Sequence, residues 1–576
     1  MKKIIIRRDR VDDSHLPDAL HPIVKQIYAA RGVKSEQQLL LNVAQLSSVE
    51  SLLGLKQGCE LLYQALQKQQ RIFIIGDFDA DGATSTALMM QALTMLGSSN
   101  HQFLVPNRFE YGYGLTPEIV DIAAEQGAQL LITVDNGISC IAGVKRAKAL
   151  GLTVIVTDHH LPGKETPPAD AIINPNQHGC SFPSKALAGV GVAFYFMLAM
   201  RKYLREQQWF SEQNISEPNI AQLLDLVALG TVADVVSLDA NNRILVEQGL
   251  KRIRAGHTRP GIQALIEVAG KNQQRLIASD FGFALGPRIN AAGRLDDMSF
   301  GINCLLATDL MTARGMAAEL DDLNKARREI EQGMQHEAEK IMKQLNFTED
   351  NLPFAIALHH PDWHQGVIGI VAGRLKEKFH RPSIVFALSE DGLELKGSAR
   401  SIPGLHIRDL LEHIAGQSPD LVKKFGGHAM AAGLTISPGD FDIFQQLFQQ
   451  HAKDWLDADS LEGKLFSDGE LPLNEMTLNF AELLRASGPW GQNFIEPVFD
   501  DEFSLVQQRI VGEKHLKLVV EKQGQVFDAI AFNIDVKQWP NHQAKKVQLA
   551  YRLDINEFRG KQSVQLMVEN LALCTR

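Results

Sequence analysis

The fold of this chain is decided by the stretch Arg71-Ile-Phe-Ile-Ile-Gly-Asp77-Phe-Asp79-Ala-Asp81-Gly82. Its first half is an apolar, β-branched run of the kind that forms a buried strand. Its second half places three carboxylates at alternate positions. Like charges at this spacing repel one another, and such a cluster at the mouth of an apolar strand is favourable mainly when a cation lies among the carboxylates. The stretch therefore predicts a buried strand that opens into a divalent-metal site.

The acidic loop has two other interpretations when it is taken alone. Asp-x-Asp-x-Asp-Gly also begins an EF-hand calcium loop, but that loop needs a bidentate Glu six residues after the glycine, where this chain has Leu88. An EF-hand also needs a helix before the loop, and this chain has a strand pattern there. A solvated acidic turn is the second interpretation.

Strand and helix patterns alternate beyond Gly82. Helices are predicted over residues 83–96, 117–125 and 139–150, with Thr116 as the N-cap of the second. Strand patterns begin at Gln102, Leu130, Thr153 and Ala171. This alternation predicts a parallel sheet flanked by helices.

Polar side chains follow several of these apolar runs. Asp135 follows one strand, the sequence Asp158-His159-His160 follows another, and Asp234 ends an apolar run that starts at Leu223. The carboxyl ends of parallel strands form one crevice, so we expect these groups to converge. Taken singly, Asp-Asn-Gly at 135–137 is also ordinary turn chemistry, and a histidine pair can simply cap a loop.

The joint pattern favours a two-metal centre. Carboxylate and imidazole sets suit manganese or magnesium, and two such ions clamp the attacking and leaving oxygens of a phosphoryl group and generate hydroxide at neutral pH. The sequence therefore predicts phosphoester hydrolysis. The residues that could build two metals bridged by one carboxylate are Asp79, Asp81, Asp135, His159, His160 and Asp234.

Arginines in loops that carry glycines supply a complementary charge. Arg108 follows a predicted strand, Arg288 and Arg294 flank Asn290 in Gly-Pro-Arg-Ile-Asn-Ala-Ala-Gly-Arg, and Arg400 follows Gly-Ser-Ala. Any one of them is more commonly a surface ion pair. As a set they indicate a polyanionic substrate, because glycine lets the backbone approach phosphate closely.

The chain of 576 residues is too long for one hydrophobic core and predicts a multidomain α/β protein. We expect an N-terminal cap over 1–50, a parallel-sheet catalytic domain with a helical insertion over 51–310 and a long connecting helix over 311–345. A smaller α/β domain is expected over 346–459 and an all-β module, a small barrel, over 460–576.

Composition excludes several classes of protein. With 45% hydrophobic and 22% charged residues the chain is neither disordered nor a membrane protein, and the apolar run 190–200 is too short to span a bilayer. The N-terminus lacks the apolar core of a signal peptide, so we expect a cytoplasmic protein. The five scattered cysteines favour neither a disulfide framework nor a zinc knuckle. The net charge of −10 does not decide the partner, because basic side chains can still line a local groove.

Several motifs in this order resemble the DHH phosphoesterase family and, within it, the bacterial single-stranded-DNA exonucleases. They are Gly76-Asp-Phe-Asp-Ala-Asp-Gly82, Val134-Asp-Asn-Gly, Asp158-His-His160, Gly230-Thr-Val-Ala-Asp234 and Phe425-Gly-Gly-His428. The resemblance runs nearly end to end. It implies that the catalytic domain is a DHH domain, that residues 346–459 form a DHHA1 domain and that the tail is an OB-fold whose groove holds single strands.

The resemblance also implies residue roles. Asp79, Asp81, Asp135, His159 and Asp234 would be ligands of two Mn²⁺ or Mg²⁺ ions, with Asp135 as the bridge. His160 would be a ligand or a phosphate contact, and Asp77 an auxiliary member of the site. The expected substrate contacts are Arg108, Arg288, Asn290, Arg294, Ser398, Arg400 and His428, of which Arg108, Ser398 and Arg400 would read the 5′ end.

The expected function is that of a 5′ to 3′ exonuclease that releases 5′-mononucleotides from single-stranded DNA in recombination and repair. It would act as a monomer, with a single-strand-binding protein and a RecQ-type helicase. One alternative is a DHH-family hydrolase of short oligonucleotides or cyclic dinucleotides. Another is an inactive DNA-binding replication scaffold, which the retention of every candidate ligand disfavours.

Overall fold

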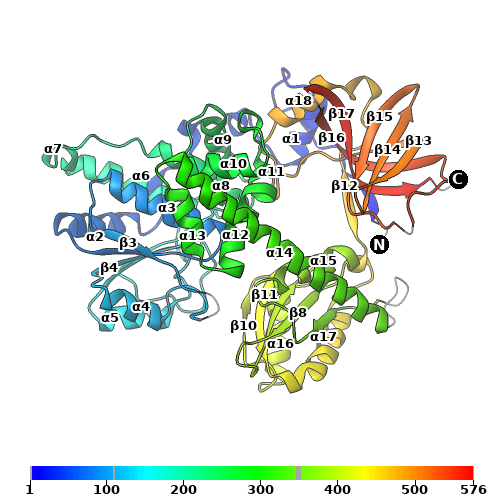
Figure 1. Ribbon diagram of the computed structural model, residues 1–576. Coiled ribbons are helices and arrows are strands. Elements are labelled where there is room, and N and C mark those ends of the chain that lie inside the picture. Colours follow the sequence, from blue (N-terminus) through cyan, green and yellow to red (C-terminus); the bar gives the residue numbers. More distant parts are fainter. Residues whose placement is uncertain (1–2, 108–109, 346–351, 537, 559, 575–576) are drawn as a thin grey trace. The chain divides into compact units, whose positions relative to one another are not determined.

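The computed structural model describes residues 3–107, 110–345, 352–536, 538–558 and 560–574. The chain forms two compact units, drawn in Figure 1. Unit 1 consists of Met1–Asp9, Lys325–Ala481 and Pro497–Arg576, and unit 2 consists of Arg10–Asn324 and Glu482–Glu496. The two units are therefore interleaved in the sequence.

Unit 2 is built on one parallel sheet, as the alternating pattern predicts. The strand order is β3-β2-β4-β5-β6, and every neighbouring pair is parallel. Its strands are β2 (Ile72–Ile75), β3 (His101–Leu104), β4 (Leu130–Val134), β5 (Thr153–Thr157) and β6 (Ala171–Ile173). All residues of β2 and β4 are buried, which is why these strands have continuous apolar sequences.

Helices of unit 2 lie on both sides of this sheet and also away from it (Figure 1). They are α1 (Pro22–Ala30), α2 (Leu55–Gln67), α3 (Ala80–Met95), α4 (Pro117–Glu125), α5 (Ile141–Ala149), α6 (Gly189–Glu206), α7 (Trp209–Glu212), α8 (Leu224–Ala233), α9 (Ala240–Arg254), α10 (Pro260–Val268), α11 (Ala278–Asp280), α12 (Gly286–Leu295) and α13 (Met298–Leu306). A π-helical segment, η6 (Phe281–Leu285), joins α11 to α12. The predicted N-cap is present, since the Thr116 hydroxyl accepts a hydrogen bond from the backbone N–H of Ile119 at 3.4 Å.

Helix α3 is the central helix of unit 2. It packs against α6, α8 and α13, and most of its side chains are buried. Because α3 begins shortly after β2, this packing fixes residues 77–82, which run from the connection into the first turn of α3 and which we call the carboxylate loop.

Unit 1 contains a five-stranded sheet with the order β10-β11-β9-β8-β7, in which only β7 and β8 are parallel. Its elements are β7 (Ile356–His359), α15 (Ile368–Phe379), β8 (Ser383–Leu388), β9 (Leu395–Arg400), α16 (Ile407–Gln417), β10 (Lys424–Gly427), β11 (Ala431–Ile436) and α17 (Phe441–Trp455). The second α/β domain of the prediction is thus a mixed sheet.

The C-terminal part of unit 1 is a closed five-stranded barrel with the order β13-β14-β15-β17-β16. Its strands are β13 (Phe499–Val511), β14 (His515–Lys522), β15 (Gln525–Ala531), β16 (Lys546–Phe558) and β17 (Lys561–Leu573). Strand β14 alternates half-buried and buried positions along its length, the period expected of a barrel with a packed interior. The predicted β-barrel is confirmed.

The unbroken helix expected after residue 310 is also present. Helix α14 (Leu310–Gln344) has 35 residues, and the division between the units falls inside it, after Asn324.

Two short segments pack with parts of the chain that are distant from them in the sequence. Strand β1 (Ile4–Arg7) pairs in parallel with β12 (Lys464–Ser467) in unit 1. Residues 482–496, which begin within α18 (Leu478–Ala486), belong to unit 2, where Tyr28 donates a hydrogen bond to the carbonyl of Ser487 at 2.9 Å. The sequence patterns predicted neither the pairing of β1 with β12 nor the assignment of residues 482–496 to unit 2.

Two glycine substitutions test the packing of unit 2. An alanine Cβ at Gly143, in α5, would lie 1.9 Å from the carbonyl oxygen of Leu115, whereas a Cβ at Gly315, on the exposed part of α14, would meet none of the described atoms within 4 Å. We expect Gly143→Ala to lower the free energy of unfolding by about 1–3 kcal/mol through overpacking. Gly315→Ala should raise it by about 0.5–1 kcal/mol through helix propensity. Denaturant unfolding of both variants measures this, and shifts of the same sign would contradict the packing.

Candidate metal centre

The carboxylate loop carries three of the predicted ligands. Asp77 and Asp81 are buried, and Asp79 is half-buried. Asp79 is the N-cap of α3, and its Oδ1 accepts hydrogen bonds from the backbone N–H groups of Asp81 (2.9 Å) and Gly82 (3.0 Å). The start of α3 thus orients the loop before any metal binds.

Asp81 is held from the opposite side by the start of α6. Its Oδ2 accepts from the backbone N–H of Gly189 at 2.6 Å, and its Oδ1 accepts from that of Val190 at 3.0 Å. Gly189 also lies against Asp135, because a Cβ at this position would come within 2.5 Å of the Asp135 side chain. Only glycine therefore lets α6 approach both carboxylates.

Asp135 directly follows β4 and is 2% exposed. Its φ is 61°, in the left-handed region that non-glycine residues seldom occupy, and such strain is common at functional sites. Its Oδ1 lies 3.1 Å from Nε2 of His159. Nε2 of His159 also lies 3.5 Å from Oδ2 of Asp234, the residue that caps the C-terminus of α8.

The structure brings all seven predicted ligands together. They form three groups that share members, and within each group the ligand atoms lie within 4.8 Å of one another. These groups are Asp135 with His159 and His160, Asp81 with His159 and Asp234, and Asp77 with Asp79 and Asp135. Since Asp135 and His159 each belong to two groups, the arrangement suits two adjacent ions that share ligands. We call these seven residues the metal centre.

Two buried carboxylate oxygen atoms indicate that a cation fits the metal centre. Oδ1 of Asp135 and Oδ2 of Asp234 are inaccessible to solvent and accept no hydrogen bond from any residue that the structure describes, and both face Nε2 of His159. Buried carboxylate oxygens left in this way are costly unless a cation binds them. The donor set of carboxylates and imidazoles therefore fits divalent metal.

Charge repulsion shows in the acid–base behaviour of these residues. Burial and the nearby Asp79 raise the pKa of Asp81 to about 7. Burial and the neighbouring carboxylates, Asp81 foremost, raise the pKa of Asp135 and Asp234 well above the usual aspartate value. A divalent cation reverses the sign of these interactions.

Asp158 supports the histidines rather than joining the metal ligands, a role that its place beside them in the sequence does not reveal. Its Oδ1 accepts from the backbone N–H groups of His159 (2.7 Å) and His160 (3.1 Å) and lies 2.7 Å from Nδ1 of His160. Its Oδ2 accepts from the N–H of Ile138 at 2.9 Å. Burial would lower the pKa of His160, but the Asp158 carboxylate outweighs it and raises this pKa to about 9.

Tyr113 is a further residue at the site that the sequence patterns did not single out. Its hydroxyl donates to the Asp135 carbonyl at 3.2 Å and lies 3.4 Å from Nδ1 of His160. Its ring meets Phe78 edge-on, with the ring centroids 5.9 Å apart. No repeat or spacing marks this tyrosine, because its role depends on tertiary contacts alone.

Of the predicted substrate contacts in α12, Asn290 holds the carboxylate loop in place. Oδ1 of Asn290 accepts from the backbone N–H of Ala80 at 2.7 Å. A Cβ at Gly293 would lie 1.9 Å from the carbonyl oxygen of Phe78, so the helix touches the loop backbone. Arg288 forms an ion pair with Asp321 at 2.8 Å. Arg294 lies in the last turn of the helix and is half-buried.

The predicted contacts Ser398, Arg400 and His428 lie in unit 1. Arg400, in β9, donates to the Ser398 hydroxyl at 3.2 Å. A Cβ at Gly369, in the first turn of α15, would lie 2.9 Å from Ser398 Oγ and 3.0 Å from Arg400 Nη2, so both side chains meet the start of this helix. His428 lies in the turn between β10 and β11. Arg108 lies outside the described residues.

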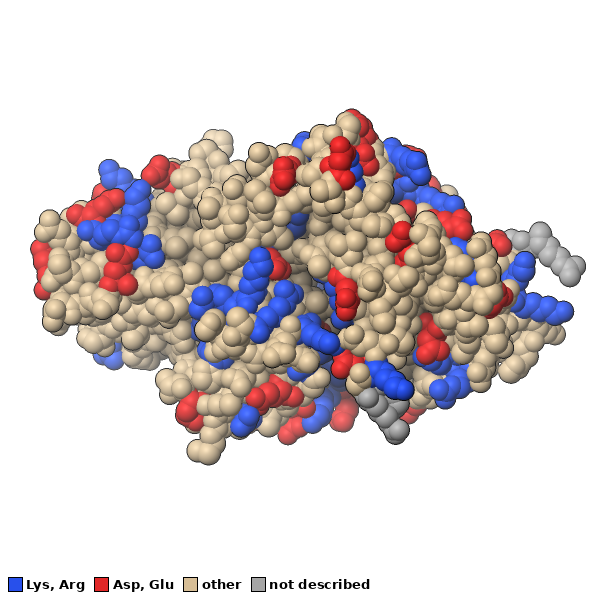
Figure 2. Space-filling view, turned by 90° about the horizontal axis from the view of Figure 1, so that it is seen from above, with Lys and Arg blue, Asp and Glu red and all other residues tan. Residues whose placement is uncertain are grey.

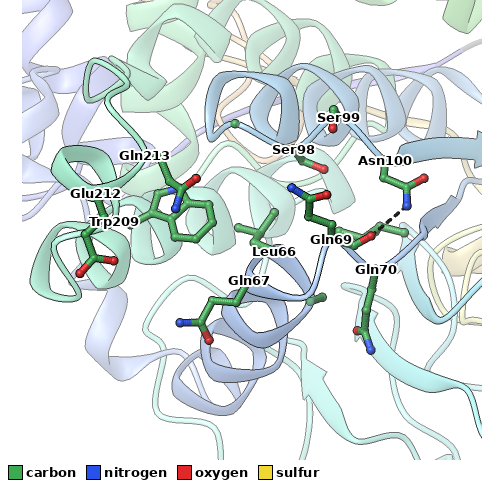
Figure 3. A pocket seen from close by; sticks show the side chains of 13 residues that line it. Leu66, Gln67, Gln69, Gln70, Ser98, Ser99, Asn100, Trp209, Glu212 and Gln213 are labelled. Carbon is green, nitrogen blue, oxygen red and sulfur yellow. Dashed lines mark hydrogen bonds between the residues drawn. The ribbon is translucent and has the colours of Figure 1, made fainter.

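A separate cavity of about 380 Å³ opens elsewhere in unit 2 (Figure 3). It is lined mainly by polar side chains that include Gln67, Gln69, Gln70, Asn100 and Gln213, and by Trp209. These residues lie around the amino end of β2, whereas the carboxylate loop follows its carboxyl end. The cavity is therefore not the metal centre.

The surface carries local concentrations of charge in spite of the negative total. Figure 2 shows one face on which Lys and Arg side chains gather into patches. Within the described ranges no helix combines the length and the apolar character that crossing a membrane requires.

Three family models match the chain. The N-terminal domain of the DHH family matches residues 71–231, the DHHA1 domain matches 351–454 and the RecJ OB domain matches 467–570. The chain is 57% identical over 573 residues to the single-stranded-DNA-specific exonuclease RecJ of Escherichia coli K12, covering 99% of each chain.

Two solved structures from Thermus thermophilus match the fold. RecJ in complex with Mn²⁺ matches with a TM-score of 0.79 and 29% identity, covering 97% of this chain and 76% of that one. RecJ in complex with Mg²⁺ matches with a TM-score of 0.73 and 27% identity, covering 97% and 75%.

The raised carboxyl pKa values predict how manganese stabilises the protein as pH changes. A carboxyl whose pKa is higher in the folded state binds protons more tightly there, so the stability of metal-free protein falls as pH rises from about 4, the unfolded value, through the folded value. For Asp81 this window ends at about 7. Metal competes with these protons, so we expect the rise in Tm caused by Mn²⁺ to grow between about pH 5.5 and 8.

Thermal unfolding in Mn²⁺ and in EDTA across this pH range measures the effect. A variant Asp121→Ala, which removes a surface carboxylate paired with Arg146, should behave like the natural protein. An Mn²⁺ shift that is constant or falls with pH would contradict metal binding at the buried carboxylates.

Proposed function

The chain belongs to the DHH family and, within it, to the RecJ exonucleases, and on this basis we propose that it is a metal-dependent exonuclease specific for single-stranded DNA. It degrades the strand from 5′ to 3′ and releases 5′-mononucleotides in DNA recombination and repair. The observation that carries the proposal is the convergence of seven ligand residues into overlapping groups around Asp135 and His159.

The proposed ligands of two Mn²⁺ or Mg²⁺ ions are Asp77, Asp79, Asp81, Asp135, His159 and Asp234. Asp135 is proposed as the bridge because it shares groups with both the carboxylate loop and the histidines. His160 contacts the substrate phosphate, since Asp158 already fixes one of its ring nitrogens at 2.7 Å.

When bound, two such ions supply a hydroxide nucleophile at neutral pH and neutralise charge on a phosphoryl group. The protein's own contribution is positioning. The start of α3, the start of α6 and Asp158 fix the side chains in advance, so little reorganisation is left for the reaction. The phosphorus–3′-oxygen bond of the terminal nucleotide breaks, and the oxygen of water joins the phosphorus.

Substrate contacts are proposed in both units. Ser398, Arg400 and the first turn of α15 form an anion site for the 5′ end, because a helix N-terminus and a guanidinium both bind phosphate. His428 and Arg294 contact the strand. Asn290 holds α12 against the carboxylate loop, and Arg288 ties α12 to α14 through its ion pair with Asp321.

The proposed domain division follows the domains of the family. We propose residues 1–50 as the N-terminal cap, 51–310 as the DHH catalytic domain, 311–345 as the connecting helix, 346–459 as the DHHA1 substrate-binding domain and 460–576 as the OB-fold that binds single strands. We propose that the protein acts in the cytoplasm, where it meets cellular DNA, and as a monomer. A single-strand-binding protein and a RecQ-type helicase are its proposed partners, since a single-strand exonuclease needs its substrate exposed.

Digestion of end-labelled single strands of both polarities, with Mn²⁺ or Mg²⁺, tests the function. We expect mononucleotides from the 5′ end. Asp135→Ala should lower the rate by about 10³-fold or more, since a metal's charge stabilisation contributes several kcal/mol. Asp121→Ala is the matched control on the surface of the same unit and should retain the rate. An undiminished rate of degradation by Asp135→Ala at saturating Mn²⁺ would refute the two-metal assignment.

The 5′-end site has its own test. Arg400→Ala should raise KM for strands with a 5′-phosphate by about tenfold, because a charge-assisted hydrogen bond contributes about 1.5–3 kcal/mol. The same substitution should affect strands with a 5′-hydroxyl much less. Arg374→Ala is the control, since its guanidinium pairs with Glu331 in the same unit. An equal loss on both kinds of strand would refute a role in reading the 5′ end.

A further inference from the structure

The turn that follows the last strand of the parallel sheet lies beside the histidine ligands. Asn174 directly follows β6 and is fully buried, and Asn176 is half-buried. Because β6 pairs in parallel with β5, its carboxyl end lies next to Asp158, whose backbone N–H donates to the Ile173 carbonyl at 3.1 Å. Neither asparagine belongs to the metal centre, yet both point polar groups at it.

The two asparagines hold the peptide carbonyls of both histidines. Nδ2 of Asn176 donates to the His159 carbonyl at 2.6 Å. Nδ2 of Asn174 donates to the His160 carbonyl at 2.9 Å. The backbone N–H groups of the same two histidines donate to Asp158. Every backbone polar group of the histidine pair is therefore hydrogen-bonded, and only the side-chain torsions still decide where the two rings lie.

Asn176 also reaches the segment that leads to α6. Its Nδ2 donates a second hydrogen bond, to the Lys185 carbonyl at 3.1 Å. Three residues farther along the chain, Ala188 is the N-cap of α6, whose first N–H groups hold the Asp81 carboxylate. The two hydrogens of one amide group thus join the peptide of His159 to the segment that holds Asp81.

The turn that carries Asn176 is closed by further hydrogen bonds. Oδ1 of Asn174 accepts from the backbone N–H of Asn176 at 2.7 Å. The Lys185 ammonium donates to the carbonyls of Pro175 at 2.6 Å and Cys180 at 2.8 Å. The turn is therefore fixed along its length, and so is the direction of the Asn176 amide. We call Asn174 and Asn176 the asparagine clamp.

We propose that the asparagine clamp is a positioning device that sets the spacing between the two sides of the metal centre. His159 and His160 form one side, and Asp81 and Asp135 form the other. Two ions that share ligands need both sides at a fixed separation, and residues that orient ligands contribute strongly to metal affinity. This inference rests on the proposed function and makes the asparagines neither metal ligands nor substrate contacts.

Removal of the Asn176 amide tests the inference. Asn176→Ala should weaken Mn²⁺ binding by about 10- to 100-fold, the range for loss of a residue that orients metal ligands. At saturating Mn²⁺ kcat on a single strand should fall by about the same factor, and KM should change less than about twofold, because the clamp holds ligands and not the strand. Titration calorimetry measures the Mn²⁺ affinity, and electron paramagnetic resonance of bound Mn²⁺ reports whether the two ions remain magnetically coupled.

Gln177→Ala is the matched control in the same turn. The Gln177 Nε2 likewise donates to two carbonyls, those of Ile172 at 2.8 Å and Leu53 at 3.2 Å, but neither residue belongs to the metal centre. Both substitutions should lower the Tm in EDTA to a similar extent, whereas only Asn176→Ala should change Mn²⁺ binding and the resonance spectrum. Asn176→Leu keeps the approximate shape of the side chain without its N–H groups and should behave like Asn176→Ala.

Three results separate the possibilities. Equal Mn²⁺ affinity and equal kcat in Asn176→Ala and Gln177→Ala would overturn the inference, as would a loss confined to KM. Natural Mn²⁺ affinity in Asn176→Leu would overturn it too, since the N–H groups would then have no role. Failure of the natural protein to bind Mn²⁺ or to degrade the strand would instead refute the proposed function.

Discussion

Mutual repulsion among buried carboxylates is the constraint on which the rest of unit 2 depends. Asp77, Asp81 and Asp135 are each less than 5% exposed, and Asp234 joins them from α8. In the absence of a cation Asp81, Asp135 and Asp234 hold protons far above the usual aspartate range, so the site is a source of instability that the surrounding fold must offset. The extensively buried sheet and α3 supply that rigidity.

The supporting hydrogen bonds are arranged so that ligand positions are fixed by the backbone. Peptide N–H groups of α3 and α6 hold Asp79 and Asp81, and Asp158 accepts from the peptides of both histidines. Such bonds cannot rotate away as side chains can. Asp135 and Asp234 differ, because each keeps a buried oxygen that accepts no hydrogen bond from the described part of the chain. Asp79 and Asp81 are thus held by peptide N–H groups, whereas Asp135 and Asp234 each leave one buried oxygen for a cation.

Local patterns were sufficient to predict the parallel sheet, the long helix and the barrel, and the candidate ligands that they singled out lie together in the structure. The roles of Asn290 and Tyr113 depend on contacts between distant segments, and no periodicity records them. The pairing of β1 with β12 was hidden for the same reason. Asp158 stands beside two predicted ligands in the sequence, but its hydrogen bonds to their backbone N–H groups and to that of Ile138 are visible only in the structure.

The interleaving of the units affects how the chain can fold during synthesis. Residues 10–324 emerge from the ribosome first, but residues 482–496, which complete unit 2, follow only after 325–481 have been made. At about 5–20 residues per second this delay is on the order of 10–30 s. During this time the ring of Tyr28 lacks Trp490 and Phe494, the two aromatic rings that stack with it in the folded protein. The nascent protein must therefore pass through a long-lived incomplete state in which chaperones have a surface to bind.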